Sequence, residues 1–162
     1  MNNFLNITDE IIKIATKKNI TISTAESFTG GFITKSITDS SGSSNVLVAG
    51  IVAYTLFAKE KFLGVKKGTL DKYTAVSKET VCEMCEGVQA YTNSTIGIAT
   101  TGFAGPNDGE NNGYCYIGFC IKSPKIDKTI HKEFHFTGDR NRVRLKATEV
   151  ALRKTLEIIK EI

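Results

Sequence analysis

Residues 20–38 combine two hydrophobic patterns. From Ile20 to Ala25, apolar and polar positions alternate with many β-branched residues, which predicts a β-strand. From Phe32 to Ile37 the apolar residues recur at helical spacing, which predicts a helix. Ser27 and Thr29 lie between the two. The start of such a helix has unpaired backbone N–H groups and favours negative charge. Ser27 could therefore act as a nucleophile, or Ser27 and Thr29 could only cap the helix.

The other segments continue to alternate between helix and strand. We expect helices from Thr8 to about Asn19, from Thr55 to Leu63, from Ser77 to about Tyr91 and from Asp139 onward, with a short helical or irregular link at 68–74. We expect strands at 46–54, 95–100, 113–121 and 128–136, the last two paired antiparallel because their connection is short. The nearly continuous apolar run at 46–54 is typical of a strand buried on both faces.

Composition and charge narrow the class of protein. At 162 residues, with 41% hydrophobic and 23% charged residues, we expect one globular domain over residues 1–162. The net charge of +4 is mild and the lysines are scattered, which suits an anionic small molecule better than a nucleic acid. No apolar run is long enough to span a membrane, and the N-terminus lacks a signal-peptide pattern. We therefore expect a cytoplasmic protein that binds neither nucleic acid nor membrane.

Cysteines and histidines are the obvious candidates for a metal site. Cys82 and Cys85 form a C-x-x-C pair, but the pair falls inside an expected helix. Cys115 and Cys120 are five residues apart in an expected strand, which fits no zinc site. Buried thiols are the better interpretation. The two histidines, at 131 and 135, lack a third ligand. We expect no metal and no other cofactor.

Polar residues follow the apolar strand at 46–54. Tyr54 and Lys59 lie just beyond its end, where open α/β sheets usually bind ligands. Lys59 could equally be a solvated helix lysine, and Tyr54 could be an amphipathic residue at the edge of the core. Thr101 begins a long loop that extends to Gly113, of the kind that active sites often use.

Three arginines open the last helix, at positions 140, 142 and 144. Cations in a first turn oppose the helix dipole. They could bind an anion jointly with the helix N-terminus, or they could point to solvent. The Ser/Gly-rich loop at 39–45 could likewise wrap a phosphate, although such residues are also common in ordinary loops.

Several motifs occur in one order and together resemble a known family. They are Thr24-Ala-Glu-Ser-Phe-Thr-Gly-Gly31, Gly42-Ser-Ser44, Val52-Ala-Tyr54, Leu63-Gly-Val65, Ala75-Val-Ser-Lys-Glu79, Thr101-Gly-Phe-Ala-Gly-Pro106 and Gly138-Asp-Arg-Asn-Arg-Val-Arg144. This pattern resembles the C-terminal domain of the competence/damage-inducible protein CinA, a family that includes stand-alone nicotinamide mononucleotide deamidases. The resemblance covers nearly the whole chain, without the additional N-terminal domain of longer members.

The resemblance implies an α/β fold with a layered, mixed β-sheet flanked by helices. It also implies hydrolysis of the carboxamide of nicotinamide mononucleotide to nicotinic acid mononucleotide and ammonia. The implied catalytic residues are Ser27 as nucleophile, Lys59 as its base and Tyr54 as a proton relay or a residue that orients Lys59. The implied substrate-binding residues are Thr29, Gly30, Ser44, Thr101, Gly102, Arg140 and Arg142, with one of the three arginines from 140 to 144 on the phosphate.

The resemblance further implies a small-molecule nucleotide as partner and a homo-oligomer, a dimer or higher. This chain departs from the family at Thr55-Leu56-Phe57, where members commonly have Ser-Asn-Glu, and at Phe28, which often corresponds to cysteine. Two alternatives to this enzyme remain open at this point. One is a non-catalytic nucleotide-binding protein that uses the same cavity, and the other is an amidase for a different small amide.

Overall fold

The computed structural model describes residues 4–162. Its helices are α1 (Leu5–Lys18), α2 (Phe32–Thr38), α3 (Leu56–Leu63), α4 (Lys67–Tyr73), α5 (Lys78–Thr92) and α6 (Arg140–Glu161), with short 3-10 turns η1 (Ser43–Asn45) and η2 (Gly109–Asn111). Its strands are β1 (Ile22–Glu26), β2 (Leu47–Val52), β3 (Ile96–Gly102), β4 (Tyr114–Lys122) and β5 (Asp127–His135). They form one mixed sheet in the order β2-β1-β3-β4-β5.

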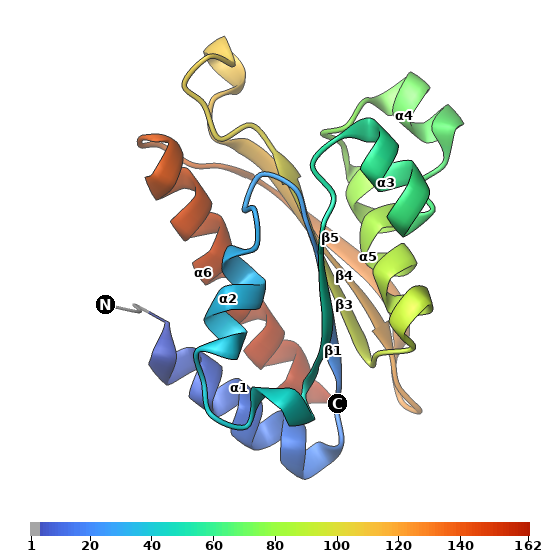
Figure 1. The fold of residues 1–162 in the computed structure, drawn as a ribbon, viewed down its shortest axis with the longest axis vertical. Helices are drawn as coiled ribbons and strands as arrows, with labels where there is room; N and C mark the ends of the chain where they lie inside the picture. The colour runs from blue at the N-terminus through green and yellow to red at the C-terminus, as the bar shows by residue number, and fades with distance from the viewer. Residues whose placement is uncertain (1–3) are drawn as a thin grey trace.

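The sheet separates two layers of helices. Figure 1 shows the sheet nearly edge-on, with α1, α2 and α6 on one face and α3, α4 and α5 on the other. Ile11, Ile33 and Ile98 belong to the buried core of the first layer. Val81 and Met84 belong to that of the second. The layered, mixed α/β fold expected from the sequence is therefore confirmed.

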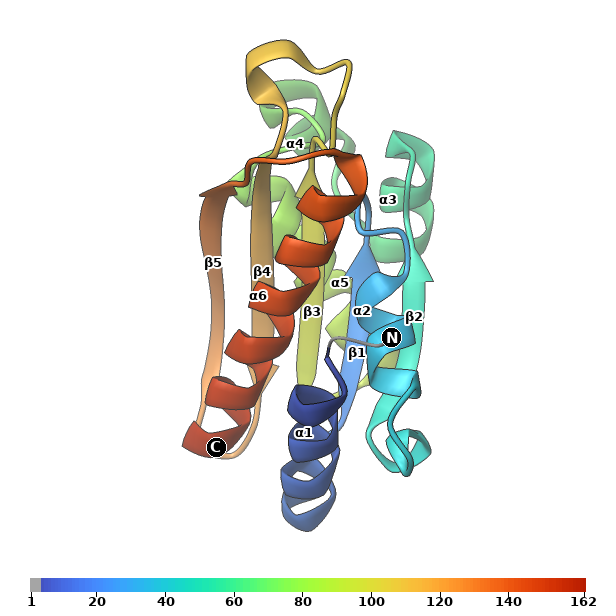
Figure 2. The same cartoon turned by 90° about the vertical axis from the view of Figure 1, so that its left-hand side faces the viewer.

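Strands β1, β2 and β3 run parallel, so their carboxyl ends meet at one end of the sheet (Figure 2). In register, Glu26 lies between Val52 of β2 and Thr100 of β3. Strands β4 and β5 form the expected antiparallel pair. Ligands of open α/β sheets bind at the carboxyl ends of parallel strands, so this end of the sheet is where a site is expected.

The prediction that the strand at 46–54 is buried on both faces is wrong. Strand β2 is an edge strand that pairs with β1 alone among residues 4–162. Its side chains alternate between half-buried and exposed, and Val48 and Val52 are about half exposed. An apolar run does not reveal whether a neighbouring strand covers it, so the sequence pattern could not distinguish these cases.

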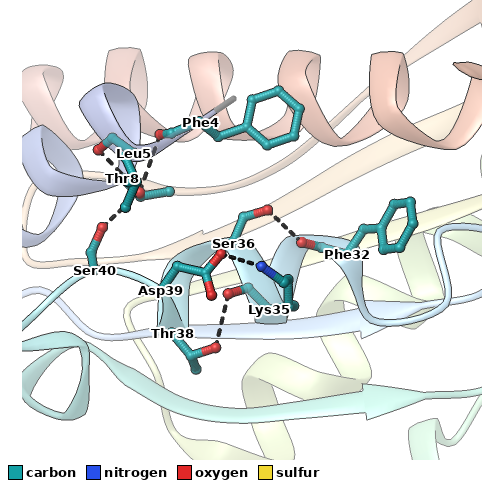
Figure 3. A network of polar contacts seen from close by, with 9 residues as sticks. All are labelled: Phe4, Leu5, Thr8, Phe32, Lys35, Ser36, Thr38, Asp39 and Ser40. Atoms are coloured by element: carbon teal, nitrogen blue, oxygen red, sulfur yellow. Dashed lines mark hydrogen bonds and ion pairs between the residues drawn. The ribbon is translucent and has the colours of Figure 1, made fainter. Parts of the chain in front are cut away.

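Helix α1 begins at Leu5, three residues before the expected cap Thr8. The Thr8 hydroxyl donates to the Phe4 carbonyl and accepts from Ser40, which follows α2 (Figure 3). Thr8 is therefore a buried link between two helices. The expected caps Ser77 and Asp139 are confirmed, because Ser77 accepts from Thr80 at the start of α5 and Asp139 accepts from Arg142 at the start of α6. The alternative that Ser27 and Thr29 cap the next helix is wrong, because the N-cap of α2 is Gly31.

Candidate active site

Ser27 follows the last residue of β1, and its backbone N–H donates to the carbonyl of Thr100 on β3. The Lys59 amine, from the inner face of α3, lies 2.9 Å from the Ser27 hydroxyl oxygen and 2.9 Å from the carbonyl oxygen of Ala53. Ser27 and Lys59 are 32 residues apart in the chain. The fold thus brings together the two residues that the sequence singled out as nucleophile and base.

Lys59 is almost completely buried, with 1% of its surface exposed. Burial removes water from the ammonium group and lowers the pKa of Lys59 to about 8. About one amine in ten is then neutral at pH 7, far more than for a lysine in water. A neutral amine at hydrogen-bond distance from a serine hydroxyl can accept its proton.

Glu26 shapes the turn that carries Ser27. Its buried carboxylate accepts hydrogen bonds from the backbone N–H groups of Gly31, Ile33 and Thr34 and from the hydroxyls of Thr29 and Thr34. The carboxylate therefore occupies the N-terminus of α2, where the helix dipole favours a negative charge. Five donors from Thr29 to Thr34 thus tie the turn and the start of α2 to the last residue of β1.

Arg144, on α6, holds the same turn from its other side. Its guanidinium donates to the carbonyls of Phe28 at 2.9 Å and Thr29 at 3.0 Å. The group also stacks over the ring of Phe32, 4.1 Å from its centroid. Gly30 has a φ of +60°, and a β-carbon there would lie 2.7 Å from Arg144. A glycine at position 30 is thus required both by backbone conformation and by the arginine beside it.

We predict that Glu26→Gln destabilises the fold. A glutamine presents an NH2 group to donors that now face an oxygen, and each buried donor left unpaired costs about 1–3 kcal/mol. With two such donors, the melting temperature should fall by about 5–10 °C in a domain of this size. The measurement is thermal unfolding by circular dichroism. The matched control is Glu149→Gln, since Glu149 pairs with Arg153 on the surface of α6 and should change the melting temperature little. Equal shifts for both variants would contradict the role of Glu26.

One cavity of about 230 Å3 contains Ser27 and Lys59. The predicted residues that line it are Ser27, Tyr54, Lys59, Thr101, Gly102 and Arg140. The Thr101 hydroxyl donates to the carbonyl of Ala75, so it helps to hold the segment before α5 against the cavity. The cavity lies at the carboxyl ends of β1, β2 and β3, as expected for this class of sheet.

Arg140 lines the cavity and bonds to two residues that border it. One of its N–H groups donates to the carbonyl of Gly105 and another to the hydroxyl of Tyr54, each at 2.7 Å. The Tyr54 hydroxyl thus contacts Arg140, whereas the amine of Lys59 contacts Ser27 and Ala53. Tyr54 is 56% exposed, so Tyr54 and Arg140 together lie at the solvent side of the cavity.

The remaining predicted binding residues lie elsewhere. Ser44 is in η1, before the first residue of β2, and hence at the end of the sheet opposite Ser27. Arg142 is exposed and does not line the cavity. Thr29 is fully buried and bonds to Glu26 and Thr100, while Gly30 packs against Arg144. Thr29 and Gly30 therefore form the turn behind the cavity, and the structure does not bring Ser44 or Arg142 to it.

Sequence reasoning missed three contributors to the site. Phe103 and Asp108 line the cavity from the loop after β3, and Asp108 accepts the N–H of Gly105. Glu26 was part of a motif but had no assigned role. A carboxylate at the last position of a strand, six residues before a helix, is a signal that could have identified it as a helix cap.

The surroundings of two cysteines make their thiols weakly acidic. Burial raises the pKa of Cys115 to about 12 and, with neighbouring carboxylates, that of Cys82 to about 11. These thiols are therefore poor nucleophiles at neutral pH. Within residues 4–162, no three His, Cys, Asp or Glu side chains gather in a group that could hold a metal ion.

In the same part of the chain, no helix has the length and apolar character needed to cross a membrane.

The site and fold together define a class: an α/β domain with a buried serine–lysine pair at the carboxyl ends of three parallel strands. The CinA C-terminal domain family matches residues 5–159. The chain belongs to this family, as its motifs predicted.

Individual relatives agree with this membership. A competence-damage inducible protein of Bacillus subtilis is 43% identical over 153 residues, covering 93% of this chain and 36% of the relative. A CinA-like protein of Kosmotoga olearia is 41% identical over 145 residues, covering 88% of this chain and 34% of the relative. This chain thus spans about a third of the length of these curated relatives.

Solved structures match over the whole fold. A CinA superfamily protein from Klebsiella pneumoniae superposes with a TM-score of 0.91 at 26% identity, covering 99% of both chains. The competence/damage inducible protein CihA from Agrobacterium tumefaciens gives a TM-score of 0.90 at 31% identity, covering 97% of this chain and 95% of that one.

Proposed function

We propose that this protein is an amidase that hydrolyses the carboxamide of nicotinamide mononucleotide to nicotinic acid mononucleotide and ammonia. The observation that carries the proposal is the 2.9 Å contact between the Ser27 hydroxyl and a buried Lys59 whose pKa is lowered to about 8. Amide hydrolysis needs a nucleophile, a proton acceptor and a site for the oxyanion. Ser27 and Lys59 provide the first two.

The reaction would proceed in two halves. Neutral Lys59 takes the proton of Ser27 while the hydroxyl oxygen attacks the carboxamide carbon. Lys59 then gives this proton to the departing nitrogen, the C–N bond breaks, and ammonia leaves an ester on Ser27. Water attacks the ester and Lys59 accepts its proton. Lys59 then passes this proton to the Ser27 oxygen as the ester C–O bond breaks, and the acid is released with Ser27 and neutral Lys59 restored. Backbone N–H groups beside Ser27 or Thr101 would stabilise the oxyanion in both halves.

The dimensions and charges of the cavity favour a pyridine carboxamide. At about 230 Å3 the cavity is smaller than the 300–1,000 Å3 typical of pockets that enclose a whole drug-sized ligand. The ring and its amide would enter, and the ribose and phosphate would extend toward the solvent side. Asp108 lines the cavity and supplies a negative charge for a cationic pyridinium ring.

Arg140 is the arginine that we assign to the phosphate. It borders the cavity at its solvent side, and a guanidinium binds phosphate oxygens with two parallel hydrogen bonds. Arg144 bonds to the carbonyls of Phe28 and Thr29 in the turn behind the cavity, and neither Arg144 nor Arg142 lines the cavity. We also assign Tyr54 to hold Arg140, because the two side chains share a hydrogen bond.

The test compares ammonia release from a panel of amides. The proposal predicts rapid hydrolysis of nicotinamide mononucleotide, slower hydrolysis of nicotinamide, which lacks the phosphate and the ring charge, and the slowest hydrolysis of non-pyridine amides. A faster reaction with a non-pyridine amide would assign the protein to a different substrate. Tight binding of nicotinamide mononucleotide without ammonia release would instead identify a non-catalytic nucleotide-binding protein.

We predict a pH dependence set by Lys59. Only the neutral amine can act as base, and its fraction grows as pH rises through the pKa of about 8. Below that value kcat/KM should rise about tenfold per pH unit, and above it kcat/KM should level off. The measurement is kcat/KM from pH 6.5 to 10, which avoids the titration of a substrate phosphate near pH 6. A flat profile over this range would contradict Lys59 as the base.

A further inference from the structure

A second cavity, of about 350 Å3, lies between the outer strands β4 and β5 and the second half of α6. In Figure 2, β5 forms the left edge of the sheet and α6 passes in front of the strands beside it. The volume falls within the range of about 300–1,000 Å3 that is typical of pockets for small ligands. The apolar residues that line this cavity, which we call the α6 groove, are Ile117, Phe119, Ile130, Phe134 and Val150.

The groove has a buried apolar floor and half-buried apolar walls. Phe119 of β4 lies opposite Ile130 of β5 in register, and Phe134 shares the face of Ile130 because side chains of a strand alternate between faces. Ile117 and Phe119 are at most 4% exposed, whereas Ile130, Phe134 and Val150 are only half-buried. None of these five side chains can form a hydrogen bond, so the part of a ligand that they enclose must itself be free of polar groups.

The charged residues that line the groove come mostly from one face of α6. Positions 153, 154 and 157 follow Val150 at the three-, four- and seven-residue spacing of one helix face. Together with one strand residue they supply three cations and one carboxylate: Lys132, Arg153, Lys154 and Glu157. The charged lining of the groove is therefore positive overall.

The carboxylate of the groove is already paired. Lys154 donates to Glu157 at 2.8 Å. This hydrogen bond and the charges of Lys154 and Lys132 lower the pKa of Glu157, so its side chain stays negative and bound to Lys154. Arg153 is paired as well, since its guanidinium makes two hydrogen bonds to Glu149, outside the groove.

Lys132 is the lining cation that remains for an added anion. It has no ion pair among residues 4–162, and its amine lies over the ring of Phe134, 5.4 Å from the ring centroid. A carboxylate beside this amine would gain a charge-assisted hydrogen bond without separating an existing ion pair. The apolar walls begin at the same place, because Phe134 itself lines the groove.

We propose that the α6 groove binds a small aliphatic carboxylic acid, with its carboxylate at Lys132 and its hydrocarbon chain against Phe119, Phe134 and Val150. The chain would cover apolar side chains that the protein leaves half-buried, and the carboxylate would neutralise the unpaired amine. An anion without a hydrocarbon chain would gain only the second of these contributions, and an uncharged hydrocarbon only the first.

The α6 groove is separate from the proposed active site. Among residues 4–162, none lines both the groove and the cavity that contains Ser27. Val150 follows Arg140 by ten residues, or about 15 Å along α6. The inference is therefore independent of the proposed reaction, and binding to the groove can be measured without any amide hydrolysis.

The first test is a titration of the 15N-labelled protein with octanoate, followed by NMR of the backbone amides. We expect saturable shifts at Ile130, Phe134 and Val150. Each methylene group that is buried tightens the Kd about fourfold, so octanoate should bind on the order of tenfold more tightly than hexanoate. Octylammonium has the same chain with the opposite charge and should bind about tenfold more weakly than octanoate.

The second test changes the charge at the groove. Lys132→Gln should weaken octanoate binding about fivefold, because it removes the cation that faces the carboxylate. The matched control is Lys128→Gln, which removes the same charge from an exposed position of β5 outside the groove and should leave the Kd unchanged. Val150→Phe, which places a ring in the groove, should abolish binding, and its melting temperature shows whether it folds.

Three results would overturn the proposal. They are an absence of saturable shifts with octanoate, equal binding of octylammonium, and equal weakening by Lys128→Gln and Lys132→Gln. Shifts centred on the exposed apolar residues Val48 and Phe57 would also overturn it, because octanoate would then bind to exposed apolar surface and not to the groove. Both lysine variants change exposed side chains, so the result does not depend on whether Val150→Phe folds.

Discussion

Ser27→Ala is expected to lower kcat for ammonia release by at least about 10³-fold, while nicotinamide mononucleotide still binds. The Ser27 hydroxyl lies 2.9 Å from the amine of Lys59, whose pKa is lowered by burial to about 8. Without it no oxygen atom at this position can attack the carboxamide. Binding should survive, because Arg140, Asp108 and the wall of the cavity are unchanged.

The measurement combines steady-state ammonia release with calorimetric binding of the substrate. Ser36→Ala is the matched control, since Ser36 is a buried serine on α2 whose hydroxyl donates to the carbonyl of Phe32 in the same helix. That control should retain most of the activity. Ammonia release at the wild-type rate by Ser27→Ala would eliminate Ser27 as the nucleophile.

Lys59→Met should cause a loss of similar size. Methionine fills much of the volume of the lysine stem and avoids leaving a buried charge, but it cannot accept a proton. Lys59→Arg should also be inactive, because a guanidinium stays protonated at all pH values of the assay. Lys61→Met, on the exposed side of the same helix, should retain full activity.

Ser27→Ala and Lys59→Met can be combined in one double variant to test whether Ser27 and Lys59 act as a unit. If Lys59 works only through Ser27, the double variant should be no slower than either single variant. The measurement is the residual rate of ammonia release for all three proteins. Losses that multiply in the double variant would mean that the two residues contribute independently, and the dyad would be wrong.

Much of this account follows from local sequence pattern. The strand, turn and helix around Ser27 have clear periodicities, and the turn leaves β1 at the carboxyl end, as predicted. The nearness of Lys59 to Ser27 could be inferred only through the family resemblance, because 32 residues separate them. Spatial contacts of this kind depend on strand order, which hydrophobic periodicity does not specify.

The roles of the three arginines show what the sequence leaves undecided. Residues 140 and 144 are one helical turn apart and share a face of α6, whereas residue 142 lies between them on another. Only the packing of α6 against the turn shows that Arg144 bonds to backbone carbonyls and that Arg140 borders the cavity.

The edge position of β2 and the role of Glu26 were not predicted for a related reason. An apolar strand looks the same in sequence whether it lies at the centre of a sheet or at its edge. A carboxylate within a strand looks the same whether it faces water or the N-terminus of the next helix. In both cases the deciding contact comes from elements whose placement the local sequence does not encode.

The most direct measurement of the central claim is ammonia release from nicotinamide mononucleotide by the purified wild-type protein. The amount of nicotinic acid mononucleotide formed is measured in the same reaction. The account predicts catalytic turnover with one ammonia for each acid, and no turnover when Ser27 or Lys59 is replaced. Unchanged nicotinamide mononucleotide after prolonged incubation with the folded protein would contradict it.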